Sequence, residues 1–314
     1  MHAIPKDRRA LWRVVEKRGR DGLAWVYRAQ STTPPKDEIE FAEALTPPLP
    51  AEEKWVLVLS SFVGCPVKCA FCDAGLKPGR KLTADEILAQ ADILVLGRYP
   101  SRLVPVRKFK VQLARVGEPM LNSEALDALC GLPLRYDAPG LLPCVSTMAP
   151  CGSENLFEEL LDLRSRVYAG REFQLQFSIH STDEEFRHRL FGVPAWTLDE
   201  IARYGNRFHR PGTRKVTLNF ALVEHSPLDP DVLSKIFSAD HFAVKLTPLN
   251  PTQSGLRTGL RSAIDPNDPR PAEALAHQLR SLGFETIVSI GDPEENRFGS
   301  NCGQMLVSAL TTSP

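Results

Sequence analysis

The sequence predicts an α/β protein whose main domain is a partial (β/α)6 barrel, preceded by a short N-terminal extension. Two observations predict this class. Short apolar runs, each the length of a buried parallel strand, recur along the chain, and helical stretches separate most of them. Several of those helical stretches also begin with a recognisable cap. Alternating strands and helices form a parallel sheet with helices packed outside, because parallel neighbours need crossover connections.

Seven apolar runs are expected to be strands, at residues 55–59, 109–113, 142–146, 174–178, 216–222, 243–247 and 286–289. The helices between them carry start and stop signals. Thr83 with Glu86 and Thr197 with Glu200 each fit a capping box. Asp229 before Pro230 fits an N-cap and first turn, and Gly283 follows an Ala/Leu-rich stretch as a C-terminal stop. Loops at the carboxyl ends of such strands build active sites, so residues just after each strand are the first candidates.

The N-terminal part of the chain is uneven in charge. Residues 1–30 carry eight Lys/Arg against three Asp/Glu, and residues 31–53 carry one Lys against six Asp/Glu in a Pro-rich stretch. We interpret residues 1–30 as a small basic extension with a solvated helix and residues 31–53 as an acidic linker. An RNA-contacting patch is the alternative for the basic part. Residues 54–314 then form the main domain.

Bulk composition narrows the function. With 314 residues, 43% of them hydrophobic, the chain can bury a sizeable core, and its formal net charge of +0 gives no overall positive field for nucleic acid. No apolar run approaches the roughly 20 residues that cross a bilayer, and the N-terminus has no apolar signal core, so we expect a cytoplasmic protein with no membrane partner. Seven cysteines, an odd number, favour metal or redox chemistry over a disulfide framework.

Three of the cysteines follow the first expected strand of the main domain in the stretch SSFVGCPVKCAFCDAG. Cys65, Cys69 and Cys72 have the spacing C-x3-C-x2-C, with Phe71 before the last cysteine. Three thiolates leave one corner of a [4Fe-4S] cluster without a protein ligand, whereas electron-transfer clusters use four cysteines. The alternative is a structural zinc site, which normally has a closed shell of four ligands, and no fourth Cys or His is paired with these three.

This spacing is the signature of the radical S-adenosylmethionine (SAM) superfamily. From about Ser60 to Gln304 the chain resembles the RlmN/Cfr-type adenine methyltransferases of 23S ribosomal RNA. The matching segments occur in that family's order at expected strand ends: SSFVGC, VGEPMLN, VSTMAP, FSIHS, PLNP and NCGQM. The resemblance implies a barrel of the radical SAM type and a methyltransferase that modifies RNA, either ribosomal or transfer RNA.

The resemblance also implies cofactors and a site. SAM chelates the free iron through its amino and carboxylate groups, and a reductant such as flavodoxin or ferredoxin supplies the electron that releases a 5'-deoxyadenosyl radical. Glu118 is expected to hold the methionine amino group, and the other implied SAM contacts are Gly117, Ser146, Ser178, Ile179, His180 and Asn250. Each has a structural alternative, since Ser and Asn at strand ends commonly cap helices and His180 can be held by hydrogen bonds within the fold.

Cys302 in NCGQM is the candidate catalytic residue. In the resembling family the cysteine of this CGQ motif accepts a methyl group from one SAM, and the radical from a second SAM takes a hydrogen from that methyl. Cys130 and Cys144 fit core packing in a helix and a strand. Cys151 follows a strand end, and nothing marks it as a ligand.

Two positions depart from the family. The second cysteine that this chemistry uses, seven positions before the first cluster cysteine, is Val58 here, and Leu45 takes the place of a nearby glutamate although Glu43 is close. Valine cannot accept a proton or form a disulfide. Three interpretations follow: a methyl synthase-like enzyme with another substrate or release step, an RNA methyltransferase in which a residue such as Cys151 replaces the thiol, or a non-catalytic iron-sulfur protein.

Overall fold

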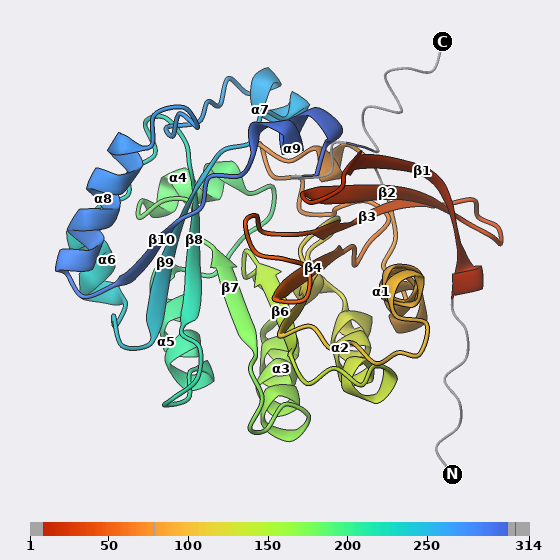
Figure 1. Cartoon of the computed structure of the whole chain (residues 1–314). Helices are drawn as coiled ribbons and strands as arrows, with labels where there is room; N and C mark the ends of the chain where they lie inside the picture. Colours follow the sequence, from red (N-terminus) through yellow and green to blue (C-terminus); the bar gives the residue numbers. More distant parts are fainter. Residues whose placement is uncertain (1–8, 78, 301–304, 306–314) are drawn as a thin grey trace.

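The computed structural model describes residues 9–77, 79–300 and 305 of the chain (Figure 1). Within these residues ten strands form one sheet in the order β1 to β10. The strands are β1 (Trp12–Arg20), β2 (Ala24–Ser31), β3 (Glu38–Ala44), β4 (Lys54–Leu59), β5 (Lys108–Leu113), β6 (Leu141–Thr147), β7 (Gln174–Ser178), β8 (Val216–Leu222), β9 (Phe242–Pro248) and β10 (Glu285–Val288). The strands β4 to β10 run parallel, whereas β1 to β4 pair antiparallel.

Helices cover the outside of the curved sheet, and Figure 1 shows α7 and α9 at one end of it. The helices are α1 (Ala84–Arg98), α2 (Ser123–Arg135), α3 (Glu154–Arg166), α4 (Glu184–Leu190), α5 (Leu198–Phe208), α6 (Pro230–Ile236), α7 (Gln253–Arg257), α8 (Arg270–Ser281) and α9 (Pro293–Phe298), with 3-10 turns η1 (Arg9–Leu11), η2 (Asp73–Leu76) and η3 (Pro119–Leu121). The seven expected strands are β4 to β10, shifted by one residue at most at either end. The predicted α/β class is confirmed, and the sheet is open because β1 and β10 are its unpaired edges.

The helix boundaries follow the predicted caps. Thr83 and Glu86 form a reciprocal capping box at the start of α1, and Thr197 and Glu200 do so at the start of α5. The Asp229 side chain accepts hydrogen bonds from the first-turn amides of α6. After α8, Gly283 adopts a positive φ of 91°, where glycine has no steric penalty.

The two faces of the parallel strands differ because side chains alternate along a strand. Large aromatic side chains such as Trp55, Phe109 and Phe220 are fully buried on the outer face, in the main hydrophobic core. The inner face carries polar residues, among them Gln112, Ser146 and others described below. This alternation leaves the concave side of the sheet available for a ligand. None of the helices in the described part of the chain combines the length and apolar character that a membrane span needs.

The N-terminal region differs from the expected helix and linker. Residues 12–31 form the hairpin β1–β2, whose turn contains Asp21-Gly22, with Gly22 at φ 80°. Within the expected linker, β3 pairs with both β2 and β4 and so belongs to the sheet. The prolines at residues 34–35 and 47–50 flank β3 and do not interrupt it, so the high proline content marks its ends. The division of the chain into domains stays a prediction.

Candidate active site

A large cavity lies on the inner side of the sheet toward the carboxyl ends of β4 to β9; we call it the central cavity. Its volume is about 840 Å³, which is within the range of small-molecule and cofactor sites. It brings together segments that are far apart in sequence. The predicted site residues that line it are Cys65, Cys69, Cys72, Gly117, Glu118, Ser146, Ser178, His180 and Asn250.

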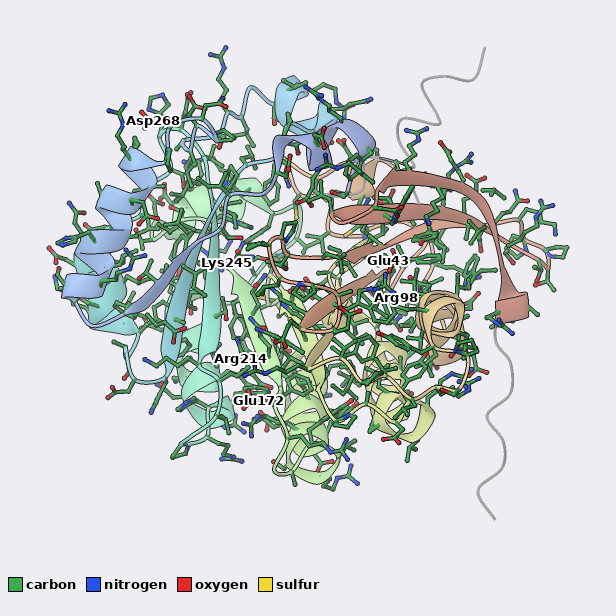
Figure 2. All side chains as sticks on the ribbon, viewed as in Figure 1. Glu43, Arg98, Glu172, Arg214, Lys245 and Asp268 are labelled. Carbon is green, nitrogen blue, oxygen red and sulfur yellow. The ribbon has the colours of Figure 1, made fainter. Side chains whose placement is uncertain are left out.

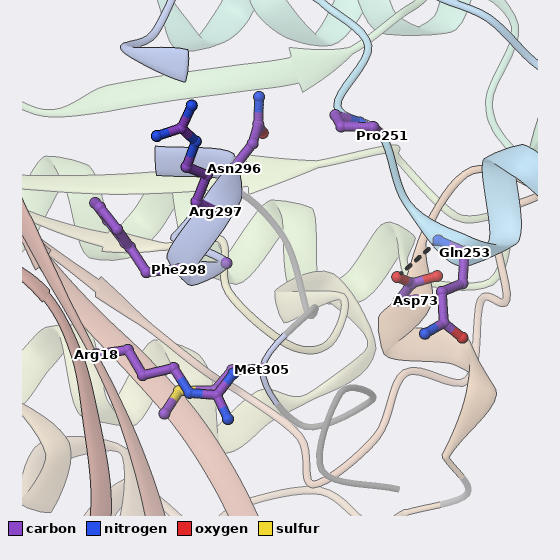
Figure 3. A pocket seen from close by; sticks show the side chains of 9 residues that line it. Arg18, Asp73, Pro251, Gln253, Asn296, Arg297, Phe298 and Met305 are labelled. Carbon is purple, nitrogen blue, oxygen red and sulfur yellow. Dashed lines mark hydrogen bonds between the residues drawn. The ribbon is translucent and has the colours of Figure 1, made fainter. Parts of the chain in front are cut away.

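The three cysteines lie in the loop after β4, which backbone hydrogen bonds and α7 hold in place. The amide of Cys65 donates to the carbonyl of Ala74, and the amide of Cys72 donates to the carbonyl of Cys69. The buried carboxylate of Asp73 accepts hydrogen bonds from the amides of Gln253 and Ser254 at 3.1 and 2.8 Å. Figure 3 shows the first of these bonds beside a second cavity of about 200 Å³ that α9 borders.

The chemistry of this donor set fits an iron-sulfur cluster better than a single ion. Among the described residues no three His, Cys, Asp or Glu side chains converge closely enough to hold one metal ion. A cubane cluster spreads three thiolates over three irons, so its ligands need not converge in this way. Burial raises the pKa of the Cys65 thiol, and the charge of Glu118 adds to this, so a cation beside Cys65 is needed to keep it as a thiolate.

Glu118 crosses from the end of β5 to the end of β6. One carboxylate oxygen accepts from the amide of Met120 and the other from the amide of Met148, both at 3.0 Å. Burial raises the pKa of Glu118 to about 7, although a hydrogen bond from Thr147 and the two backbone bonds oppose the rise. Gly117 has φ 108°, and a Cβ there would lie 2.5 Å from the Phe62 ring, so only glycine fits before this glutamate.

His180 is buried in the cavity wall with a defined tautomer. Its Nδ1 accepts a hydrogen bond from the amide of Ala221 at 3.0 Å, so the neutral ring carries its proton on Nε2. Burial, with a smaller effect of the Arg187 charge, lowers the pKa of His180 to about 3. Its ring packs edge-on against Phe71 of the cysteine loop at a centroid distance of 5.0 Å. The ring therefore presents one N–H donor, at a strand end next to the cysteines.

Ile179 is the predicted contact whose side chain lies elsewhere. The side chain is fully buried in the main hydrophobic core and is not among the described residues that line the central cavity. Its backbone amide donates to the carbonyl of Asn219. The alternation along the segment after β7 explains this, since Ser178 and His180 face the cavity and the residue between them faces the helices.

Several cavity residues were not predicted. Gln112 donates to the Ser146 hydroxyl at 2.8 Å, and Gln176, Asn219 and Lys245 also line the cavity. They lie on the inner face of their strands, where a polar residue at every second position of an otherwise apolar run was the available signal.

Arg115, at the end of β5, was also missed, and it joins three segments at the cavity wall. Its Nε lies 2.7 Å from Oε1 of Glu40 on β3, with both side chains almost fully buried. Its Nη2 donates to the carbonyl of Gly299 at 2.5 Å, and its Nη1 donates to the carbonyl of Ser300. The predicted methyl carrier, Cys302, lies outside the described residues, so Arg115 holds the last described backbone before it.

The structure shows what surrounds Val58 and Glu43, the residues at or near the two positions that depart from the family. Val58 lines the central cavity and packs with Val26, Ala42 and Met305 in a small apolar cluster. Glu43 points to the other face of β3, where Tyr27, Trp55 and Arg98 donate to its carboxylate (Figure 2). It does not take the place of a glutamate in the cavity.

The remaining cysteines also lie where their sequence positions suggest. Cys144 is buried in β6, and Cys130 packs against the core from α2. Cys151 is exposed and is not among the described residues that line the central cavity. It is therefore a poor replacement for a missing thiol at position 58.

Parallel strands, a loop with three cysteines and polar strand ends meet at one cavity in this α/β fold. A radical SAM methyltransferase from Sphaerobacter thermophilus has this fold, with a TM-score of 0.70 over 94% of this chain and 81% of that chain, at 20% sequence identity. Searched against family models, the chain matches none.

Sequence comparison finds relatives among proteins of one named kind, the RlmN RNA methyltransferases. A probable dual-specificity RNA methyltransferase RlmN of Thermus thermophilus is 29% identical over 278 residues, which are 85% of this chain and 72% of that protein. The dual-specificity RNA methyltransferase RlmN of Ruthia magnifica is 25% identical over 269 residues, 83% of this chain and 70% of that protein. The chain is a methyltransferase-type enzyme related to the RlmN proteins.

Proposed function

We propose that this protein is a radical SAM enzyme that methylates RNA, with Cys65, Cys69 and Cys72 holding a [4Fe-4S] cluster and SAM bound in the central cavity. The observation that carries the proposal is that these cysteines and all the expected SAM contacts except Ile179 border one cavity, in a chain related to RlmN proteins. When bound, the cluster and SAM supply the electron and the cleavable sulfonium bond on which the chemistry depends. A flavodoxin or ferredoxin is the proposed reductant.

In this proposal the residues of the chain bind SAM and orient it in the central cavity. Glu118 offers a fixed carboxylate for the methionine amino group, and Gly117 allows the backbone to approach it. His180 donates from Nε2, and Ser146, Ser178 and Asn250 add polar groups at the strand ends. Ile179 is not assigned to this set, because its amide donates to Asn219 and its carbonyl accepts from Arg187. We assign Cys302 the role of methyl carrier, as the CGQ motif suggests, with Arg115 holding the chain just before it.

The experiment is anaerobic turnover of the reconstituted protein with SAM, a reductant and ribosomal or transfer RNA. Formation of both 5'-deoxyadenosine and methylated adenosine, measured by mass spectrometry, is expected. Cys72→Ala should abolish both products because it removes a cluster thiolate, whereas Cys151→Ala, an exposed cysteine away from the cavity, should retain both. Loss of cluster absorption in Cys72→Ala but not in Cys151→Ala checks the metal assignment separately.

Val58 favours a second candidate, a radical SAM reaction on a substrate other than RNA, because a disulfide at position 58 is not available for product release. The same experiment separates the two. If 5'-deoxyadenosine accumulates while every RNA tested stays unmethylated, RNA is not the substrate and the second candidate stands. If neither product forms although the cluster is intact, both proposals fail.

A further inference from the structure

Four lysines occupy the inner face of the sheet, where barrel positions are more often apolar; we call them the inner-face lysines. They are Lys54 on β4, Lys108 and Lys110 on β5, and Lys245 on β9. Lys245 lines the central cavity directly. Side chains two or four residues apart on a strand point to the same face. Lys54 therefore shares the face of Val58, and Lys108 and Lys110 share that of Gln112. Val58 and Gln112 both line the cavity. The four side chains therefore point to the concave side, and all are half-buried.

The inner-face lysines are close enough to repel one another. Lys54 and Lys108 are direct partners across the β4–β5 ladder, and Lys110 is two residues further along. Burial lowers the pKa of Lys245 to about 8, and the charges of Lys110 and Lys54 lower it further. Burial, with the charges of Arg214, Lys54 and Lys110, lowers the pKa of Lys108 to about 8 as well. Figure 2 shows Arg214 toward the opposite end of the sheet from α7 and α9.

No carboxylate neutralises this charge within the described residues. None of the four ammonium groups forms an ion pair or hydrogen bond there, and the acid that acts on Lys108, Glu172, is exposed. Grouped, partly buried cations without counter-charges destabilise a fold, and a bound anion removes that cost. The amides of Gln176 and Asn219 line the same cavity and can donate hydrogen bonds to anion oxygens.

We propose that the inner-face lysines bind a phosphate group of the substrate at the inner end of the central cavity. The inference rests on the proposed function, because an RNA substrate carries a phosphate at every nucleotide. A free phosphorylated small molecule presents the same chemistry. The lysines then position the substrate from inside the barrel, whereas the expected SAM contacts lie at the strand ends. This arrangement offers a local site for a polyanion in a chain whose formal net charge is +0.

The test is binding of a fluorescent single-stranded oligoribonucleotide to the full-length protein, without SAM. In Lys110→Gln/Lys245→Gln the affinity should fall at least about tenfold. The slope of log affinity against log salt should shrink by roughly 0.7 for each phosphate that the variant no longer neutralises. The control, Lys81→Gln/Lys235→Gln, removes the same charge from two exposed lysines and should bind as the wild type does. Lys110→Arg/Lys245→Arg keeps both charges and should retain most of the affinity.

Tripolyphosphate binding, measured by calorimetry on the same proteins, identifies the source of the phosphate. Loss of oligonucleotide binding together with tripolyphosphate competition assigns the site to RNA. Loss of tripolyphosphate binding alone assigns it to a free phosphorylated ligand. Equal binding of both probes by the glutamine variant and its control overturns the proposal, and Lys245→Gln alone provides the same comparison if the double variant does not fold. Because binding is measured without turnover, a protein that binds RNA but never methylates it contradicts the proposed function and leaves this site intact.

Discussion

At the scale of single residues, the site depends on backbone positions and protonation states that few side chains can supply. Gly117 and His180 both have positive φ, at 108° and 65°, and both border the central cavity. A non-glycine residue with positive φ is uncommon, and such positions concentrate at functional sites. Each of these two residues leads to a prediction about stability.

Gly117→Ala is expected to lower the free energy of unfolding by about 1–3 kcal/mol. The new Cβ would be strained at this φ and would lie 2.5 Å from the Phe62 ring and 2.7 Å from the Ser61 hydroxyl. Urea unfolding measures the change. Gly97→Ala is the control, since that glycine lies within α1 with nothing within 4 Å of an added Cβ, and alanine there should stabilise by up to about 1 kcal/mol. Equal midpoints for the two variants would contradict the strain argument.

His180 should make the stability of the fold depend on pH. Its pKa in the folded protein, about 3, is below its ordinary value of 6.5, so the unfolded chain binds a proton that the folded chain does not. The contribution of His180 to the free energy of unfolding is therefore fully present above pH 6.5. It is lost as the pH falls toward 3, by up to about 1.4 kcal/mol per pH unit. His180→Asn keeps an acceptor for the Ala221 amide and tolerates positive φ, and it should lose less stability on acidification.

Thermal unfolding from pH 7 to pH 4 compares His180→Asn with the wild type. His188→Asn serves as the control because that histidine is exposed on α4. An identical pH dependence for all three proteins would show that His180 is not held neutral by burial.

At the scale of elements, the cysteine loop is ordered by a helix that follows it by some 180 residues. The Asp73 carboxylate accepts from two amides at the start of α7, and the Thr252 hydroxyl donates to the carbonyl of Phe71 at 2.7 Å. The short helix α7 and the loop therefore stabilise each other. The geometry of the three thiolates depends on this contact as well as on the spacing of the cysteines.

Asp73→Ala should loosen both elements, because it leaves two amides at the start of α7 without their acceptor, at a cost of about 1–3 kcal/mol. Hydrogen exchange is expected to become faster at residues 253 and 254 and in the cysteine loop. Asp199→Ala, an exposed first-turn acid of α5, should change exchange only near its own helix. Unchanged exchange at 253 and 254 would mean that Asp73 does not hold α7.

At the scale of the whole molecule, the N-terminal strands are joined to the barrel by the buried ion pair of Glu40 and Arg115. This pair links β3 to the end of β5, and Arg115 also binds the backbone of residues 299 and 300. Three distant segments thus meet at one edge of the central cavity. A substitution at either charged residue should therefore lower the stability of all three segments.

Glu40→Gln should cost about 3–5 kcal/mol, because removing one member of a buried ion pair leaves the other charge uncompensated. The double variant Glu40→Gln/Arg115→Met should be less unstable than the sum of the single variants. Guanidinium unfolding of the four proteins measures this coupling. Additive losses would show that the two side chains act independently.

The sequence alone was enough to predict the class of fold and to select nine residues that the structure places around one cavity. Capped helices cover the outer face of the parallel strands and connect them. The apolar runs and the caps therefore predict these elements locally, as for β4 to β10 and the capping box at Thr83. The cysteine spacing and the motifs at strand ends selected residues that the structure brings to one cavity, because carboxyl ends of parallel strands meet at one edge. These are properties of short segments and their order.

Tertiary structure decided what depends on pairing between distant segments. The segment expected as a linker became β3 because β2 and β4 provide partners on both sides, and composition does not reveal a pairing partner. Ile179 turned away from the cavity, Arg115 met Glu40, and four lysines gathered on one inner face, each through strand register and sheet curvature. The order of residues along the chain determines the local strands and helices. Which distant charged side chains come to lie near one another depends on how the strands pair and how the sheet curves.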